Sequence, residues 1–176
     1  MPGIILYGPP AAGKDTITAE LERLDKRYRA FSRLKSGYGR TRGYRMTSDE
    51  AIAELRRRGD VIWENRRYEA VYVVDRPGLL QSLQNGIPVV HLGQIEAVGS
   101  VTRAICDRWL VVYLWCPRDV AKARIVARGS TDVAARLSVW DATEPLARPD
   151  IALDTAKMPP QQAAQRIHAE ACARII

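Results

Sequence analysis

The 176-residue chain alternates short apolar runs with stretches in which apolar residues recur every three or four positions. Uninterrupted short runs indicate buried strands, whereas the wider spacing indicates amphipathic helices. The runs that predict strands of one buried sheet are Ile4–Tyr7, Pro88–Gly93, Leu110–Trp115 and Ile151–Leu153. Leu110–Trp115 is apolar at nearly every position, which is typical of a parallel strand that is covered on both faces.

Helical patterns follow these runs. Ile17, Leu21 and Leu24 share one predicted helix face directly after the first run. Capping and spacing signals predict further helices that begin near Asp75, Ile95, Pro117 and Pro159. The alternation of strand and helix predicts an α/β fold with a doubly wound parallel sheet, whose binding cleft lies at the carboxyl ends of its strands.

One segment interrupts this alternation. Tyr28–Leu34 is expected to be a second strand, and Lys35–Arg45, with three glycines and four basic residues, is expected to be a loop. Thr47 is expected to cap a helix that ends at Gly59, and a hairpin is expected to turn around residues 65–67. We therefore expect a small flap over the cleft.

The chain length and the absence of a linker indicate one domain, residues 1–176. Within it, we expect a core of residues 1–34 and 75–176, with the flap at about 35–74.

The loop after the first strand has the pattern Gly-x-x-x-x-Gly-Lys, in the strand–loop–helix context of a phosphate-binding loop. Its glycines allow backbone N–H groups to turn inward around a polyphosphate, and the following helix adds the positive end of its dipole. Lys14 is expected to reach the β- and γ-phosphates of ATP. The residues expected to bind the nucleotide are Gly8, Pro9, Pro10, Ala11, Ala12, Gly13, Lys14, Asp15 and Thr16.

Asp15 stands where this loop usually carries a Ser or Thr that binds Mg²⁺. A carboxylate beside a triphosphate is repelled unless a cation lies between them. We therefore expect Asp15 to hold Mg²⁺ directly or through water, with the Thr16 hydroxyl beside it at the metal and the α-phosphate. Alternatively, Asp15 is an acid in the first turn of a helix, where the helix dipole favours it.

The formal net charge of +7 suits an anionic partner, and basic residues recur in separated segments that can converge on one cleft. No RNA-binding signature is found, so we expect the partner to be a small anionic substrate rather than nucleic acid. Nor is a membrane-length apolar run or a signal peptide found, and the cysteines, Cys106, Cys116 and Cys172, are odd in number and widely spaced. These features predict a cytoplasmic protein with reduced thiols.

Several segments carry a resemblance to known enzymes. The motifs are Gly13-Lys14-Asp15-Thr16, Tyr44-Arg45-Met46, Gly59-Asp60-Val61-Ile62-Trp63-Glu64, Tyr72, and Arg124-x-x-x-Arg128-Gly129 followed by Arg136-Leu137. On these motifs the chain resembles P-loop nucleoside monophosphate kinases, most of all the guanylate kinase family. Its loop is also similar to that of ribose 1,5-bisphosphate phosphokinase.

The resemblance implies transfer of the γ-phosphoryl group of ATP, with Mg²⁺, to an anionic acceptor. It assigns Lys14 and the arginines of a helical lid at about 124–140 to the transferring phosphates, namely Arg124, Arg128 and Arg136. It assigns Tyr44, Tyr72 and one or two of Arg33, Arg40 and Arg42 to the acceptor. An exposed basic stripe is the alternative for Arg124 and Arg128, which lie four residues apart.

Two positions differ from the guanylate kinase pattern. Glu64 follows Trp63, whereas the guanine-reading glutamate of that family precedes its tryptophan. Glu64 is expected either to accept from a base or to pair with Arg66 or Arg67. His91 stands near the position of an Asp-x-Asp sequence in that family, and is expected either to contact the acceptor or to be a core histidine.

The sequence thus predicts an ATP-dependent phosphotransferase that acts on a nucleoside monophosphate or a similar small phosphate ester. The alternatives are a sugar-phosphate kinase of the ribose bisphosphate type and a nucleotide-binding module without catalysis.

Overall fold

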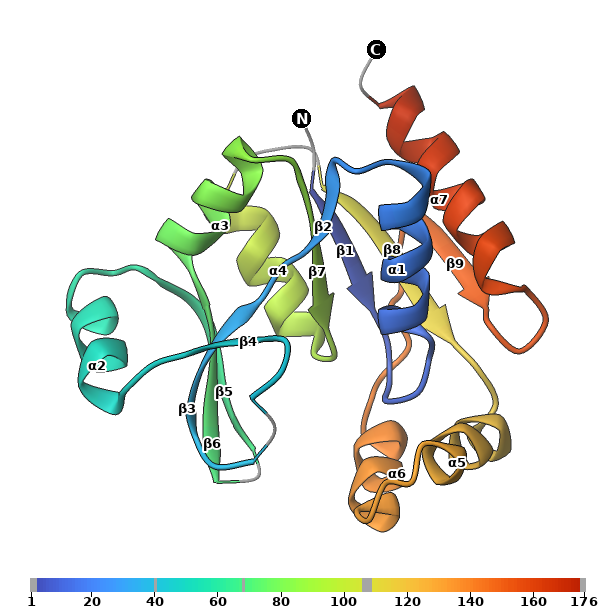
Figure 1. Cartoon of the computed structure of the whole chain (residues 1–176), viewed down its shortest axis with the longest axis horizontal. Coiled ribbons are helices and arrows are strands. Elements are labelled where there is room, and N and C mark those ends of the chain that lie inside the picture. Colours follow the sequence, from blue (N-terminus) through green and yellow to red (C-terminus); the bar gives the residue numbers. More distant parts are fainter. Residues whose placement is uncertain (1–2, 40, 68, 106–108, 175–176) are drawn as a thin grey trace.

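The computed structural model describes residues 3–39, 41–67, 69–105 and 109–174. Its larger sheet has five parallel strands in the order β2-β7-β1-β8-β9 (Figure 1). They are β1 (Ile4–Tyr7), β2 (Tyr28–Ala30), β7 (Ile87–Leu92), β8 (Leu110–Trp115) and β9 (Ile151–Asp154). The doubly wound parallel sheet that the sequence predicts is confirmed.

Helices cover both faces of this sheet. The helices that do so are α1 (Lys14–Leu24), α3 (Arg76–Gln84), α4 (Ile95–Ala104) and α7 (Pro160–Ala173). Side chains alternate along β1, so Ile4 and Leu6 pack with α1 and α7, whereas Ile5 and Tyr7 pack with α3 and α4. This two-sided burial explains why the core strands are uninterrupted apolar runs.

The connections of the sheet diverge between β1 and β7. From β1 the chain passes through α1 to the β2 edge, whereas from β7 it passes through α4 to β8 on the other side. In such sheets a crevice forms between two neighbouring strands whose connections lead to opposite edges of the sheet. Tyr7 and Leu92, the last residues of β1 and β7, pair in register at this point.

The flap is a second sheet with the strand order β4-β3-β6-β5. Its elements are β3 (Arg33–Gly37), β4 (Tyr44–Met46), α2 (Asp49–Arg57), β5 (Val61–Arg67) and β6 (Ala70–Asp75). One face packs on α2 through Ile52, Val71 and Val73. The helical pair α5 (Arg118–Ala127) and α6 (Val133–Asp141) lies across the carboxyl edge of the core sheet from the flap (Figure 1).

Four of the sequence predictions for the flap and its borders are wrong. The expected strand Tyr28–Leu34 is two strands, because β2 pairs with β7 of the core and β3 pairs with β6 of the flap. The expected loop Lys35–Arg45 contains the end of β3 and the start of β4. The hairpin turns at Glu69, with φ of 57°, and residues 65–67 belong to β5. Ser48, not Thr47, caps α2, since its side chain accepts from the Ala51 amide.

Leu24 is a further correction, because it is 44% exposed and does not share the buried face of Ile17 and Leu21. The helix ends at this residue, so the periodic pattern extends past the part of α1 that contacts the sheet. Within the described ranges, no helix has the length and apolar character that crossing a bilayer requires.

Candidate functional site

The loop between β1 and α1 depends on two glycines. An added Cβ at Gly8, with φ of 152°, would lie 2.0 Å from the Leu114 carbonyl oxygen of the neighbouring strand, so only glycine fits there. The Gly8 amide also donates to the Leu92 carbonyl at 3.2 Å. Gly13, with φ of 92°, is the N-cap of α1 and has the left-handed backbone conformation that favours glycine.

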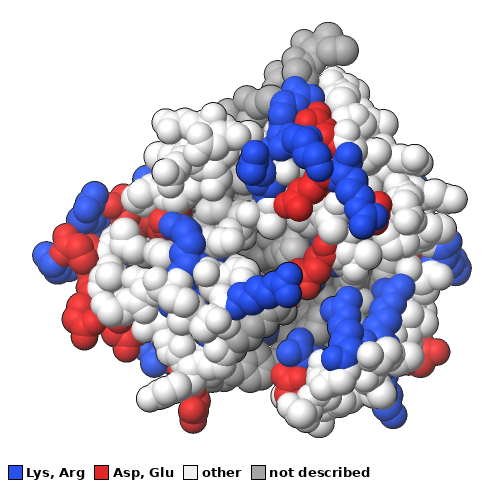
Figure 2. Space-filling model, viewed as in Figure 1, with Lys and Arg blue, Asp and Glu red and all other residues white. Residues whose placement is uncertain are grey.

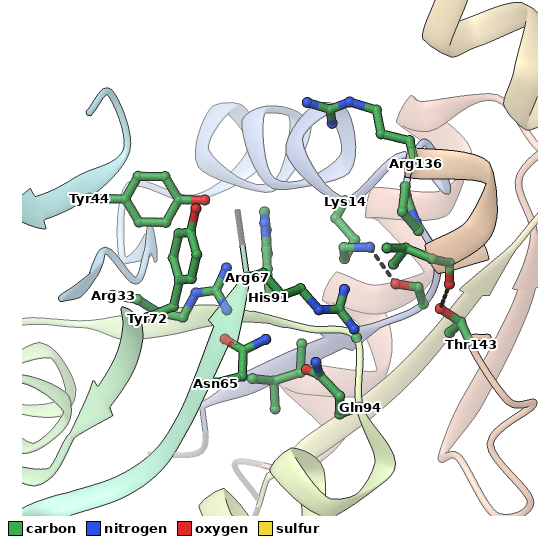
Figure 3. Close-up of a pocket in the computed structure, with 15 residues that line it drawn as sticks. Lys14, Arg33, Tyr44, Asn65, Arg67, Tyr72, His91, Gln94, Arg136 and Thr143 are labelled. Carbon is green, nitrogen blue, oxygen red and sulfur yellow. Dashed lines mark hydrogen bonds between the residues drawn. The ribbon is translucent and has the colours of Figure 1, made fainter. Parts of the chain in front are cut away.

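Lys14 lies at the centre of this loop. Its Nζ donates to the carbonyl oxygens of Gly8 at 2.5 Å and Pro9 at 2.8 Å, so the ammonium is held over the loop that is expected to surround phosphates (Figure 3). Burial lowers the pKa of Lys14 to about 8, and the positive charges of Arg33 and Arg128 act in the same direction against the negative charge of Asp15. An anion bound beside Lys14 would stabilise the charged ammonium and so offset the effect of its burial.

Three of the pockets that the described residues form meet at the loop. The flap pocket, of about 240 Å³, lies between the loop, the flap face that carries Tyr72, the β7–α4 link and α6. The hinge pocket, of about 300 Å³, lies between the loop, the β2–β3 link and Arg42. The α5 pocket, of about 170 Å³, lies between α1, α5 and the β9–α7 link. Lysine and arginine side chains gather on both sides of the hollow between the flap and the α5/α6 pair (Figure 2).

Two tyrosines and two cations form a cluster on the pocket face of the flap. The rings of Tyr44 and Tyr72 lie 5.3 Å apart, and the Arg33 guanidinium is 5.9 Å and 5.5 Å from their centroids. Lys35 is buried beneath both rings at 5.7 Å and donates to the Tyr38 carbonyl. Phenolic hydroxyls beside a guanidinium are suitable donors for a phosphate. Of the expected acceptor residues, Arg33, Tyr44 and Tyr72 are therefore together, and Arg42 lies in the adjoining hinge pocket.

His91 joins the flap and hinge pockets, both of which it lines. Its Nε2 is 2.7 Å from the Thr18 hydroxyl, and its Nδ1 is 3.3 Å from the Asp15 carboxylate. Burial lowers the pKa of His91, and the hydrogen bond that its ring donates to the Asp15 carboxylate opposes that shift. His91 is thus an ordered residue of the site rather than a histidine of the apolar core.

Asp15 and Thr16 face different cavities, since Asp15 lines the hinge pocket and Thr16 lines the α5 pocket. Among the described residues, no group of three or more His, Cys, Asp or Glu side chains could hold a metal ion. Mg²⁺ in phosphotransferases usually needs only one or two carboxylates in addition to the substrate phosphates. The exposed Asp15 carboxylate beside Lys14 fits that requirement, whereas Thr16 is placed for the nucleotide side of the loop.

The three lid arginines have different surroundings. Arg124 donates to the Ala11 carbonyl and to Thr155, so it is bound to the protein itself. Arg128 is exposed and lines both the hinge and α5 pockets, and Arg136 lines the flap and hinge pockets while it pairs with Asp132 at 2.6 Å. The structure thus brings Arg128 and Arg136 together with Lys14 at the hinge pocket, which Arg124 does not line.

Glu64 is a correction to the expected acceptor site. It lies on the α2 face of β5 and pairs with Arg56 at 2.9 Å, not with Arg66 or Arg67, and it lines none of the three pockets. The expected acceptor residue Arg40 lies outside the described residues, as does Cys106.

Sequence reasoning missed Asn65, Arg67 and Gln94, which line the flap pocket. Asn65 and Arg67 alternate with Glu64 and Arg66 along β5, and strand periodicity could have found them if the hairpin turn had been placed correctly.

No family model matches this chain, and no curated protein matches it. The solved structures that share its fold include the following three. A guanylate kinase from Anaplasma phagocytophilum matches with a TM-score of 0.62 and 13% identity, over 98% of this chain and 85% of its own. The protein APE1195 matches with a TM-score of 0.62 and 19% identity, over 99% and 97%. An unliganded sugar kinase from Janibacter sp. HTCC2649 matches with a TM-score of 0.55 and 16% identity, over 96% and 93%. The chain thus shares its fold with structures that include a guanylate kinase and a sugar kinase.

Proposed function

We propose that the protein is an ATP-dependent phosphotransferase that moves the γ-phosphoryl group to a nucleoside monophosphate or a similar small phosphate ester. The charge of the flap pocket carries this proposal. Lys14, Arg33, Arg67 and Arg136 line it, and among the described residues that line it there is no aspartate or glutamate. Such a pocket is unfavourable unless anions fill it, since like charges in a partly desolvated space repel one another.

The loop and the α5 pocket would hold ATP. The backbone amides of Ala11 and Gly13 and the N-terminus of α1 are suited to the phosphates, with Lys14 at the β- and γ-positions. Thr16 and Arg128 border the α5 pocket, which leads away from the flap and could accommodate the rest of the nucleotide.

The flap would hold the acceptor. Tyr44, Tyr72 and Arg33 are suited to its phosphate, and Lys14, His91 and Arg136 border the space between that cluster and the loop. Phosphoryl transfer requires mainly that two anionic oxygens be brought into line while developing charge is neutralised. Arg128 and Arg136 would supply that neutralisation from the side of the α5/α6 pair.

Asp15 is the residue that would hold Mg²⁺. When bound, the metal would neutralise phosphate charge and orient the oxygens for transfer. The contact between Asp15 and His91 fixes where that carboxylate lies in the hinge pocket.

The test is ADP release from ATP and Mg²⁺ with nucleoside monophosphates and sugar phosphates as acceptors, together with calorimetric ATP binding. Lys14→Ala is expected to reduce turnover by a factor of about 100 or more, as the loss of one preorganised electrostatic donor does. Lys26→Ala is the matched control, because Lys26 is exposed and lines none of the three pockets. Equal ATP binding and turnover in the two variants would exclude the phosphate-loop role. Tight ATP binding without ADP release from any acceptor would favour a binding module.

A further inference from the structure

Thr18 is a buried polar residue of α1 that has no role in the proposal above. The residue is 4% exposed and lies with Ile17 and Leu21 among the buried residues of this helix. Threonine favours an α-helix less than leucine or alanine does, and its hydroxyl loses solvation when it is buried. Because a valine has nearly the same shape without that cost, the hydroxyl calls for an explanation.

The Thr18 hydroxyl has two polar neighbours. Its Oγ1 is 2.9 Å from the carbonyl oxygen of Lys14 and 2.7 Å from Nε2 of His91. Hydroxyls of helical threonines often donate to the carbonyl four residues before them. In a regular helix that carbonyl already accepts from a backbone amide, so it does not need the hydroxyl. The contact with His91 is therefore the one that the helix itself does not explain.

The core sheet places His91 beside Thr18. His91 pairs in register with Leu6 of β1 and lies two residues after Val89, and both of these residues belong to the core cluster under α1. Residues that pair across strands, or that lie two apart on one strand, share a face of the sheet, so the His91 side chain also lies on the α1 side. On this face His91 reaches the flap and hinge pockets, both of which it lines (Figure 3).

The same imidazole ring contacts Asp15. Asp15 and Thr18 are three residues apart on α1 and so lie on one side of the helix, where the ring spans both. Nδ1 of His91 is 3.3 Å from the carboxylate, whose side chain is 66% exposed, against 23% for that of His91. An exposed side chain samples several rotamers unless a fixed partner restricts it. His91 can restrict Asp15 only if its own ring is held in place.

The protons of the ring agree with this chain of contacts. A carboxylate only accepts hydrogen bonds, so Nδ1 of His91 must carry a proton for its contact with Asp15 to be favourable. Nε2 is then an acceptor in the neutral ring and a second donor in the charged ring. The Thr18 hydroxyl can donate to the first and accept from the second. It suits His91 in either protonation state, whereas a valine suits neither.

We propose that Thr18 is a positioning residue, which holds the His91 ring through Nε2 so that Nδ1 directs the Asp15 carboxylate into the hinge pocket for Mg²⁺. The inference rests on the proposed function, because it takes Asp15 as the residue that holds the metal. Thr18 itself lines none of the three pockets at the loop, so it acts through His91. Removal of a group that orients a metal ligand typically lowers metal affinity by a factor of about 10–100.

Heteronuclear NMR of the imidazole nitrogens tests the inference in the free protein, without ATP or Mg²⁺. The chain has two histidines, so the His91 ring is identified by its absence from the spectrum of His91→Gln. The neutral ring of the wild type is expected to carry its proton on Nδ1. In Thr18→Val this tautomer is expected to lose population to the one protonated at Nε2. Thr18→Ser keeps the hydroxyl and is expected to resemble the wild type.

The Mg²⁺ dependence of ATP binding, measured by calorimetry, is a second readout. Thr18→Val is expected to raise the half-saturating Mg²⁺ concentration about tenfold, and Thr18→Ser is expected to restore most of it. Turnover of Thr18→Val is expected to fall at limiting Mg²⁺ and to recover when Mg²⁺ is saturating. Thr102→Val is the matched control, because the Thr102 hydroxyl also donates to the carbonyl four residues before it, that of Val98 at 3.0 Å, but on α4 and outside the three pockets.

A wild-type His91 ring that is protonated at Nε2 alone would overturn the inference, even if Thr18→Val did not fold. Melting temperatures of the variants show whether the fold is retained, and equal Mg²⁺ dependence of ATP binding in folded Thr18→Val and Thr102→Val would also overturn the inference. If the tautomer and the Mg²⁺ dependence change as expected but ADP is never released to any acceptor, the proposed function fails and the role of Thr18 remains. If ADP is released and the Mg²⁺ curves of the two valine variants superimpose, the proposed function remains and the role of Thr18 fails.

Discussion

The guanidinium of Arg124 donates two hydrogen bonds to Thr155, from Nη1 to Oγ1 at 3.0 Å and from Nη2 to the carbonyl oxygen at 2.7 Å. The same Nη1 also donates to the Ala11 carbonyl at 3.1 Å. Arg124 thereby links α5 to the β1–α1 loop and to the β9–α7 link. Arg128, one helical turn further, is exposed and borders two pockets.

Arg124→Ala should therefore mainly reduce stability, whereas Arg128→Ala should mainly reduce turnover. Loss of Arg124 leaves partly buried carbonyl groups without donors, which should lower the free energy of unfolding by about 1–3 kcal/mol. Arg128→Ala should leave stability within about 0.5 kcal/mol, but should raise the barrier to turnover by about 2–4 kcal/mol. Urea unfolding and steady-state kinetics on both variants measure the contrast, and equal stability losses would contradict it.

Asp15→Asn should weaken the binding of the Mg²⁺ on which activity depends. Loss of the carboxylate is expected to raise the half-saturating Mg²⁺ concentration by a factor on the order of 10 or more. Asp49→Asn is the control, because Asp49 is also an acid in the first turn of a helix, but on α2. Superimposable Mg²⁺ titrations for the wild type and both variants would leave Asp15 with the helix-dipole role alone.

Arg45 fixes the flap to the core at both of its connections. It pairs with the buried Asp75 carboxylate, which also caps α3 through the Gly78 amide, and its Nε donates to the Ser32 carbonyl at 2.8 Å. Arg45→Met should lower the free energy of unfolding by about 1–3 kcal/mol, because it leaves Asp75 without its cation. Arg57→Met is the control, since the pair of Arg57 with Glu54 lies on the exposed surface of α2. Calorimetric melting of both variants tests this, and equal losses would refute the role of Arg45 in fixing the flap to the core.

Tyr7 should make the free energy of unfolding fall as the pH rises into the alkaline range. Burial raises the pKa of Tyr7 to about 12, and its hydroxyl donates to the Glu144 carbonyl at 2.6 Å. An unfolded tyrosine loses its proton at a pKa of about 10, so the native state binds more protons above that pH. The stabilisation is fully present below pH 10 and is lost as the pH rises towards 12.

Tyr7→Phe should therefore reduce the fall in unfolding free energy between pH 10 and 11, measured by urea denaturation. Part of the fall should remain, because burial also raises the pKa of Tyr28 to about 12. An unchanged slope in Tyr7→Phe would show that Tyr7 does not contribute to this linkage.

The sequence by itself determined the core sheet and the position of the glycine-containing loop between β1 and α1. Ile4–Tyr7 and Leu110–Trp115 are uninterrupted apolar runs because helices cover both faces of the strands they form. The loop glycines could be recognised because the strained backbone and close strand contact at Gly8 exclude any side chain. These signals are local, since neighbouring residues in the sequence create them.

Only the tertiary structure decided the acceptor side of the site. Whether Glu64 or Arg67 faces the pocket depends on where the hairpin turns, because each one-residue change in strand register exchanges the two faces. Whether Arg124 is available to a ligand depends on Ala11 and Thr155, which are 113 and 31 residues away in the chain. Lys35, basic and flanked by glycine-rich sequence, resembles a loop residue until cross-strand pairing with Tyr72 buries it. Contacts between distant segments have no signature in a local pattern, and they decide which charges of this basic chain meet a substrate.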